Sequence, residues 1–250
     1  MDLQSPWFVI CEDTVLLDRG NYTTCTVNLQ GATVTSWRIQ NKEMLYVAHQ
    51  ADFTGLRHIV GGIQFVFPIM GEWSFGPRHG FARKSRWKLV QGPEKLPSED
   101  ICATFSLMYN EYTLSLWHFK FELLYKITLY EKRIDFQISV ENWDARYAME
   151  FVIVQHCWWR LDDIHKCKIK GLRNCQYKDF LKQNQVAREY RDEVTIRQQT
   201  NRVYYRTPNK LVVEDTVAGG SLNLLRKNGR DVVVWNPWIE ETLMVNNLGT

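Results

Sequence analysis

The sequence lacks a strong charge of either sign. Its 31 basic and 28 acidic residues leave a formal net charge of +3 at pH 7, and no basic run is dense enough to indicate a nucleic-acid surface. No apolar stretch reaches the length of a membrane span, and residues 1–6 have no basic region leading into an apolar segment. We therefore expect a cytoplasmic chain that binds neither nucleic acid nor membrane and whose charge suits a small anionic ligand.

Closely spaced cysteines are also missing. The six cysteines are thinly spread, with no Cys-x-x-Cys pair, and without a secretory context this pattern predicts reduced thiols. The histidines and cysteines have no zinc-site spacing, even in the run His165-Lys166-Cys167. We expect no metal site.

Helical periodicity is scarce, whereas strand patterns are frequent. Apolar and polar residues alternate from Ile134 to Val140, which predicts a half-buried strand. Residues 119–130 before it are rich in aromatic and β-branched types, and the short break at 131–133 predicts a hairpin. The best helical stretch, residues 179–197, is too polar to bury an apolar stripe.

Three later apolar runs, at residues 211–213, 222–225 and 232–235, are separated by turn-forming dipeptides. Gly219-Gly220 follows the first run, and Asn228-Gly229, a strong hairpin signal, follows the second. The sequence shows no βαβ alternation, internal repeat or linker. These features predict an all-β sandwich of antiparallel sheets that forms one domain over residues 1–250.

A first segment that could carry chemistry extends from Gly61 to Arg83. The adjacent glycines Gly61 and Gly62 would let the backbone approach a ligand closely, and His79 and Arg83 would supply hydrogen-bond donors four residues apart. A turn followed by a surface histidine and arginine fits the same spacing equally well.

Two further segments carry groups that can transfer protons. His156 comes just after the apolar run 149–154, at the predicted end of a strand and among aromatic residues. Partial burial there would tune its pKa, although strand histidines are more often structural. Glu240 follows Trp235 and Trp238, an apolar setting that would raise the basicity of a carboxylate. The alternative is a surface glutamate just past a strand.

Taken in order, these segments resemble the glucose-6-phosphate 1-epimerases, the hexose-6-phosphate mutarotase branch of the aldose 1-epimerase superfamily. Residues 31–37 are similar to the family's Gly-Ala-x-Val-x-Ser-Trp strand. The glycine pair, His-Gly-Phe-Ala-Arg at 79–83 and Trp-Asn-Pro-Trp at 235–238 then follow in family order. The resemblance covers nearly the whole chain and implies a galactose mutarotase-like β-supersandwich.

The resemblance also implies an activity and residue roles. His156 matches the family's general acid and Glu240 its general base, His79 and Arg83 match its substrate-binding residues, and Asp179 matches its sugar-contacting aspartate. The implied isomerase interconverts the α and β anomers of a hexose 6-phosphate. The base removes the proton of the C1 hydroxyl while the acid protonates the ring oxygen, so no cofactor is needed. We expect a monomer whose partner is a small sugar phosphate.

The chain departs from the family pattern at two places. Val60 stands where the family has an arginine on the phosphate side of the substrate, and Arg78 or Arg57 are candidates to replace that charge. The chain ends at Thr250, so we expect a supersandwich that lacks its last strands. Two alternatives to the sugar-phosphate enzyme stay open: a mutarotase for an unphosphorylated aldose, and a catalytically silent carbohydrate-binding protein.

Overall fold

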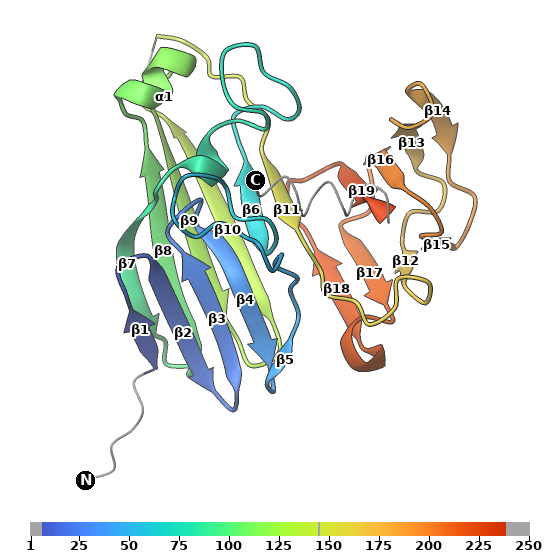
Figure 1. Ribbon diagram of the computed structural model, residues 1–250, viewed down its shortest axis with the longest axis horizontal. Helices are drawn as coiled ribbons and strands as arrows, with labels where there is room; N and C mark the ends of the chain where they lie inside the picture. The colour runs from blue at the N-terminus through green and yellow to red at the C-terminus, as the bar shows by residue number, and fades with distance from the viewer. Residues whose placement is uncertain (1–6, 145, 239–250) are drawn as a thin grey trace. The chain divides into compact units, whose positions relative to one another are not determined.

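The computed structural model describes residues 7–144 and 146–238 of the chain (Figure 1). Strands hold 48% and helices 6% of the residues, which confirms the prediction of an all-β chain. The chain divides into two compact units, Met1–Trp159 and Arg160–Thr250, and the assignment of one domain stays a prediction. None of the described helices is both long and apolar enough to cross a membrane.

The first unit is built from two antiparallel sheets. One has the order β1-β2-β3-β4-β6-β11, with β5 paired to β4, and the other has the order β10-β9-β8-β7. The strands are β1 (Phe8–Ile10), β2 (Thr14–Gly20), β3 (Thr23–Asn28), β4 (Thr33–Ile39), β5 (Lys42–Glu43), β6 (Ile63–Val66), β7 (Lys88–Lys95), β8 (Ile101–Met108), β9 (Phe121–Leu129), β10 (Ile134–Asn142) and β11 (Val154–Cys157). A 3₁₀ turn η1 (Ala82–Lys84) and a short helix α1 (Glu111–Leu116) complete the unit.

The core of the first unit lies between these two sheets. Alternate residues of β9 point to one face, so Phe121, Leu123 and Tyr125 are all fully buried. The ring of Tyr125 meets that of Phe65 on β6 edge to face, with 4.6 Å between centroids. Apolar side chains of both sheets therefore interdigitate as in a sandwich.

The hairpin predicted around residues 131–133 is confirmed. Strands β9 and β10 pair antiparallel from Ile134 opposite Leu129 to Asn142 opposite Phe121. The turn is closed by the Tyr130 amide, which donates to the Arg133 carbonyl at 2.8 Å. The alternation at residues 134–140, the aromatic and β-branched content of residues 119–130 and the short break between them were sufficient to predict the two strands and their hairpin connection.

The second unit holds two four-stranded antiparallel sheets, ordered β15-β12-β17-β18 and β14-β13-β16-β19. The strands are β12 (Lys168–Lys170), β13 (Gln176–Asp179), β14 (Gln185–Arg188), β15 (Glu193–Thr195), β16 (Thr200–Tyr205), β17 (Lys210–Glu214), β18 (Ser221–Leu225) and β19 (Val232–Asn236), and a 3₁₀ turn η2 spans Val217–Gly219. Residues 179–197, the most helix-like stretch of the sequence, thus form short strands and turns.

The hairpin predicted at Asn228-Gly229 is wrong. Asn228 does have the positive φ of a turn residue, at 64°, but β18 pairs with β17, whereas β19 leaves that sheet and pairs with β16. The strand change places Val234 of β19 in the buried cluster that also contains Tyr204 and Leu211. Burial of apolar side chains between the two sheets outweighs the local turn preference.

Candidate functional site

The glycine pair packs against the backbone of the first unit. A Cβ atom on Gly61 would lie 2.4 Å from the Cα of Val47, and one on Gly62 would lie 2.2 Å from the carbonyl oxygen of Val34. Both glycines also have positive φ angles, of 120° and 67°. The glycines thus allow close approach to the backbone at Val47 and in β4 (Thr33–Ile39), which fixes the start of β6, and an approach to a ligand stays a prediction.

His156 lies on β11 directly opposite Gln64 of β6. Strand β11 begins at Val154, later than the apolar run 149–154 suggested, so His156 is inside the strand and not at its end. Its ring stacks on that of Trp158, with 5.2 Å between centroids. Burial, and then the positive charge of Arg83, lower the pKa of His156 to about 4, so the imidazole is neutral at pH 7.

His79 has a defined tautomer. Its Nδ1 accepts a hydrogen bond from the Gly71 amide at 3.0 Å, and its own amide donates to the Gly71 carbonyl at 2.8 Å. Burial, followed by the charges of Arg83 and Arg78, lowers the pKa of His79 to about 4. In the neutral ring the proton therefore resides on Nε2, which is a donor held in place by the loop 71–79.

Arg83 is a buried cation on η1, with 8% of its surface exposed. Its Nη2 donates to the Arg78 carbonyl at 3.1 Å, while its Nε has no hydrogen-bond partner within residues 7–144 and 146–238. Burial, and then the charge of Arg78, lower the pKa of Arg83 to about 10, which leaves it protonated at neutral pH. Among the described residues no carboxylate forms an ion pair with Arg83. A buried charge of this kind is costly, and an anionic ligand would satisfy it.

Arg78 and Arg57 differ from Arg83 in exposure. Arg78 is mostly exposed and its Nε forms an ion pair with Glu72 Oε1 at 3.0 Å, and Arg57 is also exposed. Val60 is 6% exposed and apolar. The charge of Arg83 acts on both His79 and His156, so these three side chains lie near one another, and the carbonyl of the exposed Arg78 accepts a hydrogen bond from Arg83.

Comparisons with known proteins identify the family of the chain. The family model described as aldose 1-epimerase matches residues 13–249, which is most of the chain. The chain belongs to the aldose 1-epimerase family. A provisionally named glucose-6-phosphate 1-epimerase from Cenchrus ciliaris is 27% identical over 239 residues, which are 92% of this chain and 72% of that protein.

Solved structures confirm the galactose mutarotase-like fold. A provisionally named mutarotase of Salmonella typhimurium, YeaD, aligns with a TM-score of 0.79 at 23% identity, covering 92% of this chain and 76% of the other. A galactose mutarotase related enzyme from Lactobacillus acidophilus aligns with a TM-score of 0.72 at 17% identity, covering 88% and 80%. The enzyme class follows from the family-model match: members of the aldose 1-epimerase family are isomerases of the mutarotase type.

One histidine near these groups, His58, was not predicted from the sequence. His58 is half-buried, and burial, followed by the charges of Arg83 and Lys84, lowers its pKa to about 3. His79 and His156 also act on it electrostatically. Its position just before the glycine pair is a signal that could have been found in the sequence. His79 and His156 also lie at segments that resemble the family.

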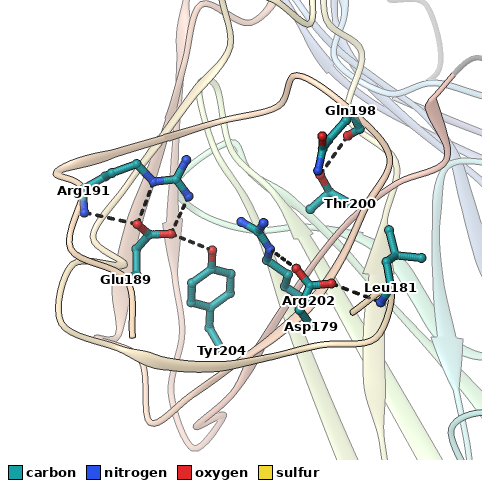
Figure 2. Close-up of polar contacts among 8 residues, drawn as sticks. All are labelled: Asp179, Leu181, Glu189, Arg191, Gln198, Thr200, Arg202 and Tyr204. Atoms are coloured by element: carbon teal, nitrogen blue, oxygen red, sulfur yellow. Dashed lines mark hydrogen bonds and ion pairs between the residues drawn. The ribbon is translucent and has the colours of Figure 1, made fainter. Parts of the chain in front are cut away.

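Asp179 belongs to the second unit, where it ends β13 and is 5% exposed. Figure 2 shows both carboxylate oxygens engaged: Oδ2 accepts from Arg202 Nε at 2.9 Å, and Oδ1 accepts from the Leu181 amide at 3.1 Å. The sugar contact implied for this aldose 1-epimerase aspartate stays a prediction. Glu240 lies outside the described residues, so its role as general base also stays a prediction.

No group of three or more histidine, cysteine, aspartate or glutamate side chains within residues 7–144 and 146–238 is arranged to hold a metal ion. All six cysteines are free. The groups that this family member brings together in its first unit are imidazoles and a guanidinium, which bind and protonate oxygen atoms without forming a metal site.

Proposed function

We propose that this aldose 1-epimerase family member is a mutarotase for a hexose 6-phosphate. The observation that carries the proposal is the buried guanidinium of Arg83, which lacks an acidic partner among the described residues and lies close enough to His156 to lower its pKa. A phosphate group would supply the missing negative charge, and arginine is well suited to bind it. The Cenchrus ciliaris protein, whose name specifies glucose 6-phosphate, is consistent with this substrate.

The same geometry explains how a phosphate would assist the chemistry. His156 is neutral at pH 7, with a pKa of about 4 caused first by burial and second by the charge of Arg83. A phosphate dianion that neutralises Arg83 removes the second cause, so the pKa of His156 rises toward the working range of a general acid. His156 then protonates the ring oxygen, and a base, for which Glu240 is the predicted residue, takes the C1 hydroxyl proton.

A second candidate is a mutarotase for an unphosphorylated aldose. It is favoured by Val60, because this buried apolar side chain stands at the position of the arginine that the family resemblance implies. The contribution of one lost charge-assisted contact is about 1.5 to 3 kcal/mol, or about ten- to a hundredfold in affinity.

Anomer exchange followed by NMR on the purified chain tests the proposal. We expect faster exchange of glucose 6-phosphate than of glucose or galactose, and we expect His156→Asn to slow it by about 10² to 10⁴. Glu240→Gln should have a similar effect if the general-base assignment is correct. Faster exchange of the free sugars would favour the second candidate, and binding without exchange would indicate a silent carbohydrate-binding protein.

A further inference from the structure

The imidazole of His156 stacks on the indole of Trp158. The two ring centroids are 5.2 Å apart, and the ring planes make an angle of 27°. His156 lies on β11, and Trp158 follows the last residue of that strand. Because residues two apart along an extended chain project to the same face, one short segment presents both rings side by side.

An imidazole that acts as a general acid needs support of this kind. The torsion that turns a histidine ring about its Cβ–Cγ bond has broad energy minima, so the side chain alone does not fix where its ring nitrogens point. Proton transfer requires a donor within about 2.6 to 3.2 Å of its acceptor, and a displacement of about 1 Å can lower the rate about a hundredfold. A second ring stacked on the imidazole favours one ring plane and restricts that torsion.

The backbone of Trp158 is fixed by a closed set of hydrogen bonds among three segments. The Trp158 amide donates to the Gly62 carbonyl at 2.8 Å, the Gly62 amide donates to the Tyr46 carbonyl at 2.7 Å, and the Tyr46 amide donates to the Trp158 carbonyl at 2.9 Å. Gly62 directly precedes β6, the strand that pairs with His156 at Gln64. The indole and the imidazole are therefore attached to the same backbone framework.

The ring of Tyr46 gives the indole a second contact. It stacks on Trp158 with 6.3 Å between the centroids and 29° between the ring planes. The segment that carries this ring is tied to β4, because Oε1 of Glu43 accepts hydrogen bonds from the amides of Leu45 at 3.1 Å and of Trp37 at 3.0 Å. Trp158 is thus held both through its backbone and through its ring, as a residue that positions another must be.

We propose that Trp158 is a positioning residue for the general acid of this mutarotase: its indole holds the imidazole of His156 in the orientation from which it protonates the ring oxygen, and Tyr46 supports the indole. This inference rests on the proposed function, since it takes His156 as the general acid. Trp158 acts through His156 and itself exchanges no proton. Its removal therefore affects the chemical step more than the binding of the sugar phosphate.

Anomer exchange of glucose 6-phosphate by Trp158→Leu tests the proposal. Loss of the ring should lower kcat about ten- to a hundredfold and leave KM nearly unchanged, because the general acid is misplaced while the groups that bind the substrate remain. Trp158→Phe keeps an aromatic ring at this position and should recover most of kcat. An unchanged kcat in Trp158→Leu would overturn the proposal, and so would a loss that Trp158→Phe does not recover.

A double variant, Trp158→Leu with His156→Asn, shows whether the indole acts through the imidazole. We expect it to be no slower than His156→Asn alone, because the effects of residues that act as a unit are not additive. Two losses that add would show that Trp158 acts independently of His156 and would overturn the proposal. Trp143→Leu is the matched control, since Trp143 is half-exposed and its ring contacts that of Tyr109, and its kcat should equal that of the unmodified chain.

The orientation of the imidazole can also be followed by NMR without any activity. The carbon-bound imidazole protons of His156 are assigned by the loss of their resonances in His156→Asn, and the stacked indole should displace these resonances from the values of an exposed histidine. In Trp158→Leu we expect them to move toward those values, and in Trp143→Leu to stay. Resonances that do not move in Trp158→Leu would overturn the proposal. Resonances that do move, in a chain that exchanges no sugar phosphate, would support the positioning by Trp158 and overturn the proposed function alone.

Discussion

The second unit pairs its buried carboxylates with arginines, as the first unit does for Asp100 with Arg19, whereas Arg83 of the first unit is a buried charge of another kind. In the second unit, Glu189 is 3% exposed, and its carboxylate is bound by Arg191 at 2.7 Å and by the Tyr204 hydroxyl at 3.1 Å, as Figure 2 shows. Asp179 is paired with Arg202 in the same unit. In the first unit, Arg83 is buried next to imidazoles and has no ion-pair partner among the described residues.

This difference separates charges that stabilise the fold from charges that can bind a ligand. In a buried ion pair with satisfied hydrogen bonds, the attraction between the charges offsets the cost of removing them from water. Loss of one partner leaves the other charge uncompensated and destabilises the fold. A buried cation without an acid raises the free energy of the folded state, and natural proteins retain such groups mainly at functional sites. The comparison therefore assigns Arg202 mainly to stability and Arg83 to binding.

The largest expected effect is the loss of stability in Arg202→Met. The substitution leaves the buried carboxylate of Asp179 without its cation, and we expect the free energy of unfolding to fall by about 3 to 5 kcal/mol. Denaturant unfolding followed by tryptophan fluorescence measures the change. Arg83→Met is the matched variant in the first unit, and its stability should equal or exceed that of the unmodified chain.

A double variant, Asp179→Asn with Arg202→Met, separates pairing from packing. Because the uncompensated charge is then removed, we expect a substantial part of the lost stability to return. If Arg83→Met is destabilised as strongly as Arg202→Met, the two charges do not differ in the way described, and Arg83 is a structural residue.

A further expected effect, spread over several pH units, concerns the pH dependence of stability. His58, His79 and His156 have ordinary pKa values of 6.5 that fall to about 3, 4 and 4 in the folded chain. Between these limits only the unfolded chain binds the protons, so the free energy of unfolding decreases as pH falls from 6.5 toward 4. Unfolding curves at a series of pH values should show this decrease, and His58→Gln should reduce it.

In the second unit we expect stability to depend on pH over a different range. Hydrogen bonds and charge from Arg191, together with the Tyr204 hydroxyl, overcome the effect of burial and hold the pKa of Glu189 below its ordinary value of 4.5. The stability that this carboxylate contributes is present above that value and is lost as pH falls below it. A stability profile that is flat between pH 6.5 and 4.5 would contradict the histidine assignment and leave that of Glu189 unaffected.

Much of the fold could be predicted from the sequence because the signals were local. The alternation from Ile134 to Val140 and the short break before it determined the β9–β10 hairpin. The pairing of β19 with β16 could not be predicted in this way, since it depends on the burial of Val234 among residues distant in the chain. Asn228-Gly229 predicted a turn, but it did not identify β16 as the partner of β19, the strand that follows.

The site was predictable where a motif marked it. His79, Arg83 and His156 were named from the sequence, and the electrostatic influence of Arg83 on both histidines shows that they lie close together. His58 was not named from the sequence, although it lies just before the glycine pair, because a histidine at that position has no role in the motifs that mark the other residues.

The most direct test of the central claim is the affinity of the chain for glucose 6-phosphate relative to glucose, measured by calorimetry on the unmodified protein and on Arg83→Met. We expect the unmodified chain to prefer the phosphorylated sugar by at least about tenfold, the free energy of one charge-assisted contact. Arg83→Met should lose that preference while it remains folded and binds glucose as before. A preference that survives in Arg83→Met would contradict the account.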